Sequence, residues 1–146
     1  MIYIKQITEK DIDLCFELDS NTISLWSKRQ WAKEFKKDGV LAFGAIIENF
    51  VIGVCVFQIV LDEAQINFFA IKQKYRKKGF GFQLMSYLIE HCEKLNISKL
   101  LLEVSHTNTA AEKFYNRFDF LTVGVRENYY KDGSDALLKE KKLTKK

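Results

Sequence analysis

The residues with the clearest potential for chemistry form a short basic loop near the middle of the chain, Arg76-Lys77-Lys78-Gly79-Phe80-Gly81. The loop follows an apolar stretch, 65–71, and precedes residues that recur at helical spacing. The first turn of a helix offers unpaired N–H groups and a partial positive charge. Glycines let a phosphate approach the backbone closely, and the neighbouring cations add attraction. The loop is therefore predicted to bind an anion such as a phosphate.

Two common phosphate-binding loops do not fit this sequence. The dinucleotide pattern G-x-G-x-x-G needs a glycine where Leu84 stands, and that loop normally follows the first strand of its fold. The P-loop pattern G-x-x-x-x-G-K-[ST] is absent from the chain. The bland alternative is a glycine-rich turn that carries exposed lysines and binds nothing.

Glu103 is the second residue with chemical potential, because it lies inside the apolar stretch Leu100–Val104. A carboxylate in such a strand costs free energy unless it is paired or used. The residues alone leave two interpretations open. Glu103 is either a functional carboxylate or an outward-facing strand residue that forms a salt bridge.

Hydrophobic periodicity predicts the elements that position these residues. Strands are expected at 2–5, 40–47, 51–61, 65–71, 100–104, 120–125 and 136–138, and helices around 12–18, 28–38, 82–92 and 108–118. Ser27 to Gln30 has the form of a capping box at the start of the second helix. The central order of strand, helix, strand, helix and strand indicates an α/β or α+β sheet with at least one parallel pair. Ligands of such sheets bind beyond the carboxyl ends of parallel strands, which is where the basic loop lies.

Length and composition favour a single domain that spans residues 1–146. The chain has 146 residues, of which 47% are hydrophobic, with no proline and a net charge of +4. The lysine-rich segment 139–146 is expected to be a solvated basic tail. No signal peptide and no apolar run near the ~18 residues of a membrane span is recognised, so a cytoplasmic protein without a membrane partner is expected.

The cysteines and histidines do not suggest a metal site or a disulfide framework. Cys15, Cys55 and Cys92 are scattered, no CxxC pair exists, and His91 and His106 are far apart in sequence. Reduced, buried thiols in a cytoplasmic protein are expected.

A series of motifs in fixed order resembles the GNAT superfamily (GCN5-related N-acetyltransferases). The motifs are residues 64–71, the Arg-x-x-Gly-x-Gly loop, 101–104, 108–111 and 114–115, within a resemblance that extends from residue 2 to residue 143. It implies the GNAT fold, a mixed, mostly antiparallel twisted sheet of about seven strands with a central parallel pair and about four helices. It also implies an N-acetyltransferase with acetyl-CoA as cosubstrate and no metal.

The resemblance assigns cofactor-binding residues. The backbone of the strand before the loop would pair with the pantetheine arm at Phe69, Ala70 and Ile71, and the pyrophosphate would bind along Arg76, Lys77, Lys78, Gly79, Phe80, Gly81 and Phe82. Asn108 matches a position that contacts the cofactor arm, although it could equally serve as the N-cap of the following helix.

The resemblance also assigns two catalytic residues. Glu103 would be the general base, acting directly or through a water, and Tyr115 would be the general acid that protonates the departing sulfur. An ordinary glutamate, with a pKa of about 4.3, is a weak base, so burial or a relaying water is required. The alternative for Tyr115 is a core aromatic on the helix face shared with Ala111 and Phe118.

Within the superfamily the chain resembles the RimI-type ribosomal-protein-alanine N-acetyltransferases. The matching segments are Trp26-Ser27, residues 102–104 and 108–115, and Arg126-x-Asn128-Tyr129-Tyr130 followed by Asp135-Ala136. This implies that the acceptor is the N-terminal α-amine of a protein, a ribosomal protein that begins with alanine. An α-amine has a pKa near 7.7–8.0, against about 10.4 for lysine, so a modest base suits it better.

Two rival functions remain open at this point. An acetyltransferase for a small amine, such as a polyamine or an antibiotic, would share every cofactor residue, and only the Arg126–Tyr130 element argues against it. A basic domain could instead bind nucleic acid through the cations of Lys72–Lys78. Because these cations cluster in one loop without interleaved exposed aromatics, no direct nucleic-acid partner is expected.

Three positions depart from the family pattern. Asp119 stands where glycine is common after the catalytic tyrosine's helix, which aspartate tolerates in a left-handed turn. Gln73 replaces a usual proline. Phe68 replaces a usual asparagine close to the expected acetyl group, and therefore bears on the identity of the acceptor.

Overall fold

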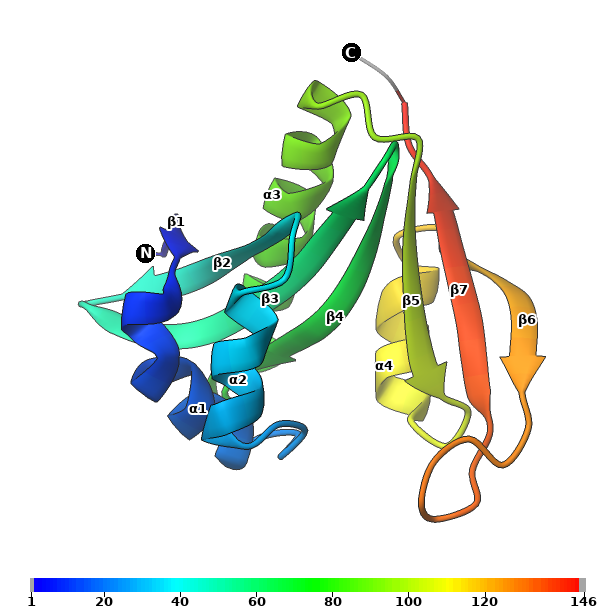
Figure 1. Ribbon diagram of the computed structural model, residues 1–146, viewed down its shortest axis with the longest axis horizontal. Helices are drawn as coiled ribbons and strands as arrows, with labels where there is room; N and C mark the ends of the chain where they lie inside the picture. Colours follow the sequence, from blue (N-terminus) through cyan, green and yellow to red (C-terminus); the bar gives the residue numbers. More distant parts are fainter. Residues whose placement is uncertain (1, 145–146) are drawn as a thin grey trace.

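The computed structural model describes residues 2–144 and is built on one seven-stranded sheet (Figure 1). The strand order is β1-β2-β3-β4-β5-β7-β6, and every neighbouring pair is antiparallel except β4 and β5. The strands are β1 (Tyr3–Ile7), β2 (Val40–Ile47), β3 (Phe50–Val60), β4 (Glu63–Ile71), β5 (Lys99–Ser105), β6 (Leu121–Arg126) and β7 (Ala136–Lys142). The helices are α1 (Ile12–Ser20), α2 (Lys28–Phe35), α3 (Phe80–Lys94) and α4 (Thr109–Asn116), with short 3-10 turns η1 (Glu9–Asp11) and η2 (Gln73–Tyr75).

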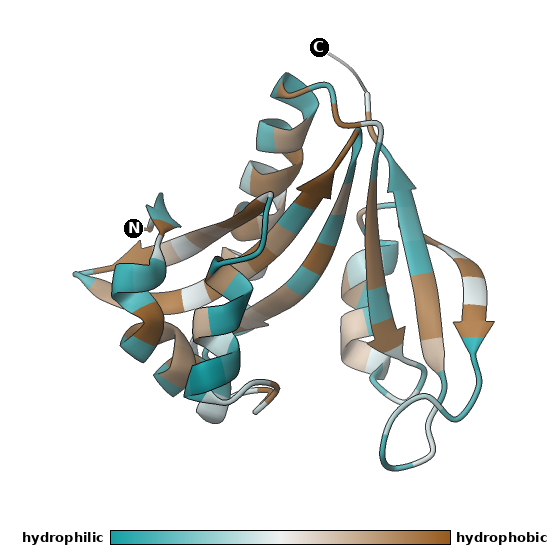
Figure 2. Ribbon diagram, viewed as in Figure 1, coloured by the Kyte–Doolittle hydropathy of each residue, from teal (hydrophilic) through white to brown (hydrophobic). Residues whose placement is uncertain are grey.

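The helices cover both faces of the sheet. In the view of Figure 1, α1 and α2 lie in front of the sheet, and α3 and α4 lie behind it. The front cluster of buried residues includes Leu18, Trp31 and Phe68, and the rear cluster includes Leu84 and Leu100. Figure 2 shows β3 mostly hydrophobic and the outer helix α2 mostly hydrophilic, as expected for a strand enclosed between helices and for a helix at the surface. This sheet, with its parallel pair and four helices, confirms the predicted fold.

The parallel pair is short, and its strands then separate. Residues 63–65 of β4 pair with residues 99–101 of β5, and no pairing continues beyond them. Figure 1 shows the two strands diverging toward their carboxyl ends. A bulge in β4 leaves Asn67 without a partner on β3, since Val56 faces Phe68 and Phe57 faces Ile66. Phe69 therefore turns toward α4, where its ring meets that of Tyr115 at 6.4 Å.

Local signals in the sequence are confirmed at several boundaries. Ser27 and Gln30 form the predicted capping box of α2, with hydrogen bonds in both directions. Asp119 adopts a left-handed φ of 65° after α4, as its substitution for glycine requires. All three cysteines are free and buried, and burial raises the pKa of each thiol to about 12. Unreactive, protonated thiols are therefore expected.

The predicted basic tail at 139–146 is wrong over its first half. Residues 139–142 belong to β7 and pair with β5, and Lys139 is buried, with its ammonium donating to Asn116 Oδ1 on α4 at 3.0 Å. Successive side chains of β7 point to opposite faces of the sheet, where Lys139 meets Asn116 and Glu140 meets Lys99. These partners explain why a lysine-rich sequence forms a strand here. Residues 145 and 146 lie outside the described part of the chain. No described helix is long and apolar enough to cross a bilayer.

His91 gives the fold a dependence on pH. Its ring packs in α3 against Phe43 and Phe57, with centroid distances of 5.0 and 6.2 Å. The Nε2 atom is buried and has no hydrogen-bond partner within residues 2–144. Burial, with a smaller contribution from the charge of Lys94, lowers the pKa of His91. The unfolded chain therefore takes up this proton at a higher pH than the folded protein does.

We expect the free energy of unfolding to fall as the pH drops below about 6.5, because protonation of this imidazole then favours the unfolded chain. His91→Phe removes the titrating group but keeps a ring against Phe43. Urea denaturation of both proteins across about pH 5 to 7 should show a weaker pH dependence for the variant. An identical dependence in the two proteins would contradict this assignment.

Candidate active site

The connection from β4 to α3 presents backbone N–H groups to solvent. Gly79 is the N-cap of α3 with a φ of +84°, and no side chain caps the helix. Lys77 also has a left-handed φ, 61°, so the chain turns sharply just before the helix begins. The first-turn N–H groups of α3 are therefore free to bind an anion. A Cβ at Gly79 would meet no atom within 4 Å, which shows that this position faces open space.

A hollow of about 700 Å³ lies where β4 and β5 have separated. Its walls come from β4, from the loop and first turn of α3, from α4, and from the connection between α1 and α2. Ten of the predicted site residues line it: Phe69, Ala70, Ile71, Arg76, Lys77, Gly79, Gly81, Phe82, Asn108 and Tyr115. Five residues that the sequence did not single out for this site also line it: Ile23, Ala110, Ala111, Phe114 and Arg117.

Three predicted residues do not line this hollow: Lys78, Phe80 and Glu103. Phe80 packs inward, with its ring 6.2 Å from that of Tyr75. Arg76 lines the hollow, and its Nε also donates a hydrogen bond to the carbonyl oxygen of Ile71, the last residue of β4, at 2.9 Å. The structure gives Arg76 a fixed position in the loop as well as a charge.

Asn108 and the inner face of α4 form the wall opposite β4. Asn108 is the N-cap of α4, where its Oδ1 accepts from the N–H of Ala111 at 3.1 Å, and it also lines the hollow. Both interpretations of this residue therefore fit the same geometry. Ala111, Phe114 and Arg117 follow at helical spacing, so the periodicity of α4 could have indicated them once Asn108 was placed.

Tyr115 is held in this wall by aromatic packing. Its ring contacts those of Phe69, Phe114 and Phe120, with centroid distances of 6.4, 5.4 and 5.6 Å. Burial, with a minor contribution from Cys55, raises the pKa of Tyr115 above that of an ordinary phenol. The phenol is therefore protonated at neutral pH and able to donate a hydrogen bond into the hollow.

Glu103 lies on the opposite face of β5 from Tyr115. Leu102 and Val104 point into the cluster under α3 and α4, so Glu103 between them faces the side of α1 and α2. Its carboxylate is 3.6 Å from the Nε atom of Arg126, and its side chain keeps 24% of its exposure. Glu103 is therefore an outward-facing, ion-paired strand residue, which was one of the two interpretations of the sequence. A chemical role for its carboxylate is compatible with this position.

The segment Arg126–Tyr130 surrounds this carboxylate. The guanidinium of Arg126 lies over the ring of Tyr129 at 5.6 Å. Burial, together with the negative charge of Glu103, raises the pKa of Tyr130. Charged and hydrogen-bonding groups thus gather on one side of the gap between β4 and β5, while the hollow is lined mainly by β4, α3 and α4, with Ile23 from the side of Glu103. A long ligand in the hollow and a second molecule beside Glu103 could meet through that gap.

Phe68 does not line the hollow. Its side chain is buried on the face of α1 and α2, and its ring lies 5.7 Å from that of Trp26 and 4.9 Å from that of Trp31. The bulge at Asn67 places both Asn67 and Phe68 on that face. The departure from asparagine therefore changes the packing beneath the connection between α1 and α2.

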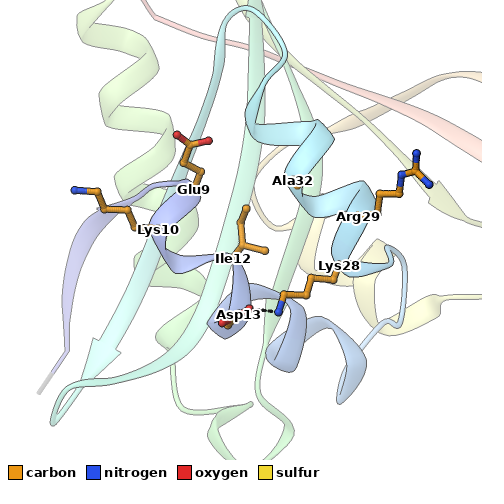
Figure 3. Close-up of a pocket in the computed structure, with 7 residues that line it drawn as sticks. All are labelled: Glu9, Lys10, Ile12, Asp13, Lys28, Arg29 and Ala32. Atoms are coloured by element: carbon orange, nitrogen blue, oxygen red, sulfur yellow. Dashed lines mark ion pairs between the residues drawn. The ribbon is translucent and has the colours of Figure 1, made fainter.

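A second, shallow hollow lies between the start of α1 and the start of α2 (Figure 3). Its lining is mainly charged, and Lys28 forms an ion pair with Asp13 there at 2.5 Å. None of the predicted site residues lines it. Within residues 2–144, no group of three or more His, Cys, Asp or Glu side chains could hold a metal ion.

A separated parallel pair of strands with a glycine turn and an uncapped helix beside the gap forms an anion-binding site at this end of the sheet. The model of the Acetyltransferase (GNAT) family matches residues 6–120, and the chain belongs to this family. It is an acetyl-CoA-dependent N-acetyltransferase, as predicted from the sequence. The hollow, the free N–H groups and the flanking cations Arg76 and Lys77 fit acetyl-CoA.

Curated relatives are similar over nearly their whole length. The [ribosomal protein bS18]-alanine N-acetyltransferase of Haemophilus ducreyi is 31% identical over 144 residues, covering 90% of this chain and 92% of that protein. A Bacillus subtilis relative that carries the same name provisionally is 32% identical over 138 residues, covering 92% of this chain and 91% of its own.

Solved structures agree with the fold. The ribosomal-protein-S18-alanine N-acetyltransferase from Escherichia coli superposes with a TM-score of 0.93 at 27% identity, covering 100% of this chain and 96% of that one. Ard1 from Thermoplasma volcanium gives a TM-score of 0.86 at 24% identity and covers 99% of both chains, which shows the shared fold.

Proposed function

We propose that this enzyme acetylates the N-terminal α-amine of a protein, a ribosomal protein that begins with alanine. The observation that carries the proposal is the carboxylate of Glu103, which lies beside Arg126 and the Tyr129-Tyr130 pair on the face opposite the cofactor hollow. The side chain of Glu103 keeps 24% of its exposure there, so an acceptor amine can reach its carboxylate. The names of the relatives at 31% and 27% identity support the same acceptor.

Acetyl-CoA would lie along the hollow. The backbone of Phe69–Ile71, which does not pair with β5, would pair with the pantetheine arm. The pyrophosphate would bind at the N-terminus of α3, along Arg76 to Phe82, and Asn108 would contact the arm from α4. Arg117, from the C-terminal end of α4, adds a further cation to this wall.

Glu103 would act as the general base on the acceptor amine. An α-amine is already neutral in roughly 10–20% of molecules at pH 7. The base therefore has to remove only the one proton that the neutral nitrogen loses as it attacks the thioester. Because Arg126 lies close to one carboxylate oxygen, Oε1, the other oxygen is the one that we assign to the amine or to a relaying water.

Tyr115 would stabilise the departing sulfur. A free thiol has a pKa of about 8.5, so its thiolate is a weaker base than the phenolate of a tyrosine whose pKa is raised. Complete proton transfer from Tyr115 is therefore uphill, and the hydroxyl would act chiefly as a hydrogen-bond donor to the sulfur in the transition state.

Tyr115→Phe should lower kcat by about 10²-fold while the dissociation constant of CoA changes little, because the ring and its packing remain. Steady-state kinetics together with calorimetric titration of CoA would measure both quantities. Phe114→Tyr alters the neighbouring aromatic ring of α4, which also lines the hollow, keeps the hydroxyl of Tyr115 and is the control for altered packing. Wild-type turnover in Tyr115→Phe would remove this residue from the mechanism.

We place the enzyme in the cytoplasm, where its three buried thiols would stay reduced, with no direct nucleic-acid or membrane partner. We also treat residues 1–146 as a single domain. A small-molecule amine such as a polyamine remains the alternative acceptor.

A panel of substrates tests the proposed function. Peptides that begin with alanine and match ribosomal-protein N-termini, peptides with an internal lysine, and spermidine are incubated with acetyl-CoA, and mass spectrometry locates the acetyl group. Acetylation of the N-terminal alanine amine is expected. Turnover of spermidine alone would refute the proposal in favour of a small-molecule acetyltransferase.

A further inference from the structure

Asp19, near the C-terminal end of α1, is a fully buried carboxylate outside the machinery described above. It accepts hydrogen bonds from the backbone N–H of Leu25 (2.7 Å), from that of Trp26 (2.9 Å) and from the indole Nε1 of Trp31 (2.9 Å). No cation forms an ion pair with it within residues 2–144. A buried carboxylate is costly unless N–H donors replace its lost water, so these three bonds fix the carboxylate and its donors together.

The three donors belong to the connection between α1 and α2 or to α2 itself. This connection, residues 21–27, also folds back on the carbonyl oxygen of Asp19, which accepts from the N–H groups of Thr22 (3.0 Å) and Ser24 (2.7 Å). Ser24 has a left-handed φ of 56°, a conformation that a serine rarely adopts without support. The shape of the connection therefore depends on its bonds to Asp19.

Ile23 is the residue that this connection presents to the active site. Its side chain is 48% exposed and lines the hollow that Phe69 and Tyr115 also line. The connection belongs to the side of the sheet that carries α1, α2 and the carboxylate of Glu103. Ile23 is therefore a wall of the hollow that comes from the same side of the sheet as Glu103.

An aromatic cluster continues from the same connection into the sheet. The ring of Trp26 meets that of Trp31 at 4.8 Å, and both lie on Phe68 of β4. Phe68 precedes Phe69, whose side chain faces the hollow from the other side of the strand. The carboxylate of Asp19 thus fixes the connection at one end, and the Trp26–Phe68 contact fixes it to the cofactor strand.

We propose that Asp19 is a positioning residue that holds Ile23 as the acceptor-side wall of the hollow. The first side chain of the acceptor packs against Ile23, so this wall favours a small residue such as alanine. The inference rests on the proposed function, because the acceptor is taken to be a polypeptide N-terminus. The residues proposed to bind the cofactor belong to β4, α3, α4 and their adjoining loops and do not bond to that carboxylate, so the affinity for CoA is expected to be insensitive to Asp19.

Asp19→Asn tests the positioning role. An amide nitrogen cannot accept a hydrogen bond, so at least one of the three N–H donors loses its partner. The KM for an N-terminal alanine peptide should rise about tenfold, while kcat and the dissociation constant of CoA stay within about twofold. Both tryptophans of the chain lie in this cluster, so quenching of tryptophan fluorescence by acrylamide should increase in the variant.

Ile23→Ala and Leu25→Ala form a matched pair that does not depend on the folding of the Asp19 variant. Both side chains are about half exposed, at 48% and 47%, and both lie in the connection, but only Ile23 lines the hollow. Ile23→Ala should weaken the preference for an alanine peptide over a leucine peptide by about tenfold. Leu25→Ala should leave that preference unchanged.

The results separate this inference from the proposed function. Unchanged peptide KM in Asp19→Asn, an equal loss of CoA affinity, or equal effects of the Ile23 and Leu25 substitutions would each overturn the inference. A wild-type enzyme that acetylates spermidine and no peptide would refute the proposed function alone. In that case the KM for spermidine is compared between the wild-type enzyme and the two variants. An unchanged KM for spermidine in both Asp19→Asn and Ile23→Ala would overturn the positioning role of Asp19.

Discussion

Replacing Gly79 with glutamate is expected to abolish acetyl-CoA binding while the protein stays folded. A side chain at this position enters open space beside the uncapped start of α3, since a Cβ there meets no atom within 4 Å. Glutamate would bring a negative charge to the place proposed for the pyrophosphate and would compete for the free N–H groups. The affinity for CoA should fall by more than about 10²-fold, which calorimetric titration measures directly.

Gly133→Glu is the matched control for Gly79→Glu. Gly133 has nearly the same φ, +85° against +84°, and a Cβ there also meets no atom within 4 Å. Both substitutions therefore carry a similar backbone strain of about 1–2 kcal/mol, but only the first adds charge beside α3. Equal losses of CoA affinity in the two variants would refute a pyrophosphate site at Gly79.

Much of the cofactor side could be predicted because its signals are local. A glycine that adopts a left-handed φ before a helix, as Gly79 does, follows from residue type and spacing. The Asn108 cap of α4 is likewise encoded within a few residues. The fold followed from the order of strands and helices, since a parallel pair needs the crossover helix that residues 82–92 supply.

Other features depend on contacts between distant parts of the chain and left no local signal. Ile23 reaches the hollow only because Asp19 fixes residues 21–27, and no periodicity marks an irregular connection. The strand at 139–142 forms because β5 and Asn116 provide partners for a sequence whose composition resembles a solvated tail. The bulge at Asn67 decides which way Phe68 and Phe69 point, and a bulge requires the register of the neighbouring strand.

The two faces of β5 explain why the proposed catalytic residues need not touch. Strand alternation places Leu102 and Val104 under α4 and leaves Glu103 on the other face. The thioester would therefore meet Tyr115 from the side of α4, and the amine would meet Glu103 from the side of α1 and α2. Such an arrangement predicts that both substrates are bound together before the acetyl group moves.

Glu103→Gln should lower kcat by about 10²–10⁴-fold while leaving the dissociation constant of CoA unchanged, because the amide keeps the size of the carboxylate but cannot take a proton. Stopped assays of peptide acetylation and calorimetric titration of CoA would measure the two effects separately. A loss of CoA affinity equal to the loss of rate would instead indicate a structural role.

Glu140→Gln is the control that isolates chemistry from charge pairing. Glu140 lies on the adjacent strand β7, its side chain is 20% exposed against 24% for Glu103, and its carboxylate is 3.6 Å from the ammonium of Lys99, the same separation as between Glu103 and Arg126. If Glu103 only formed a salt bridge, the two substitutions would have equally small effects on kcat, of about twofold or less. A large effect confined to Glu103 therefore assigns the proton transfer to the carboxylate beside the gap between β4 and β5.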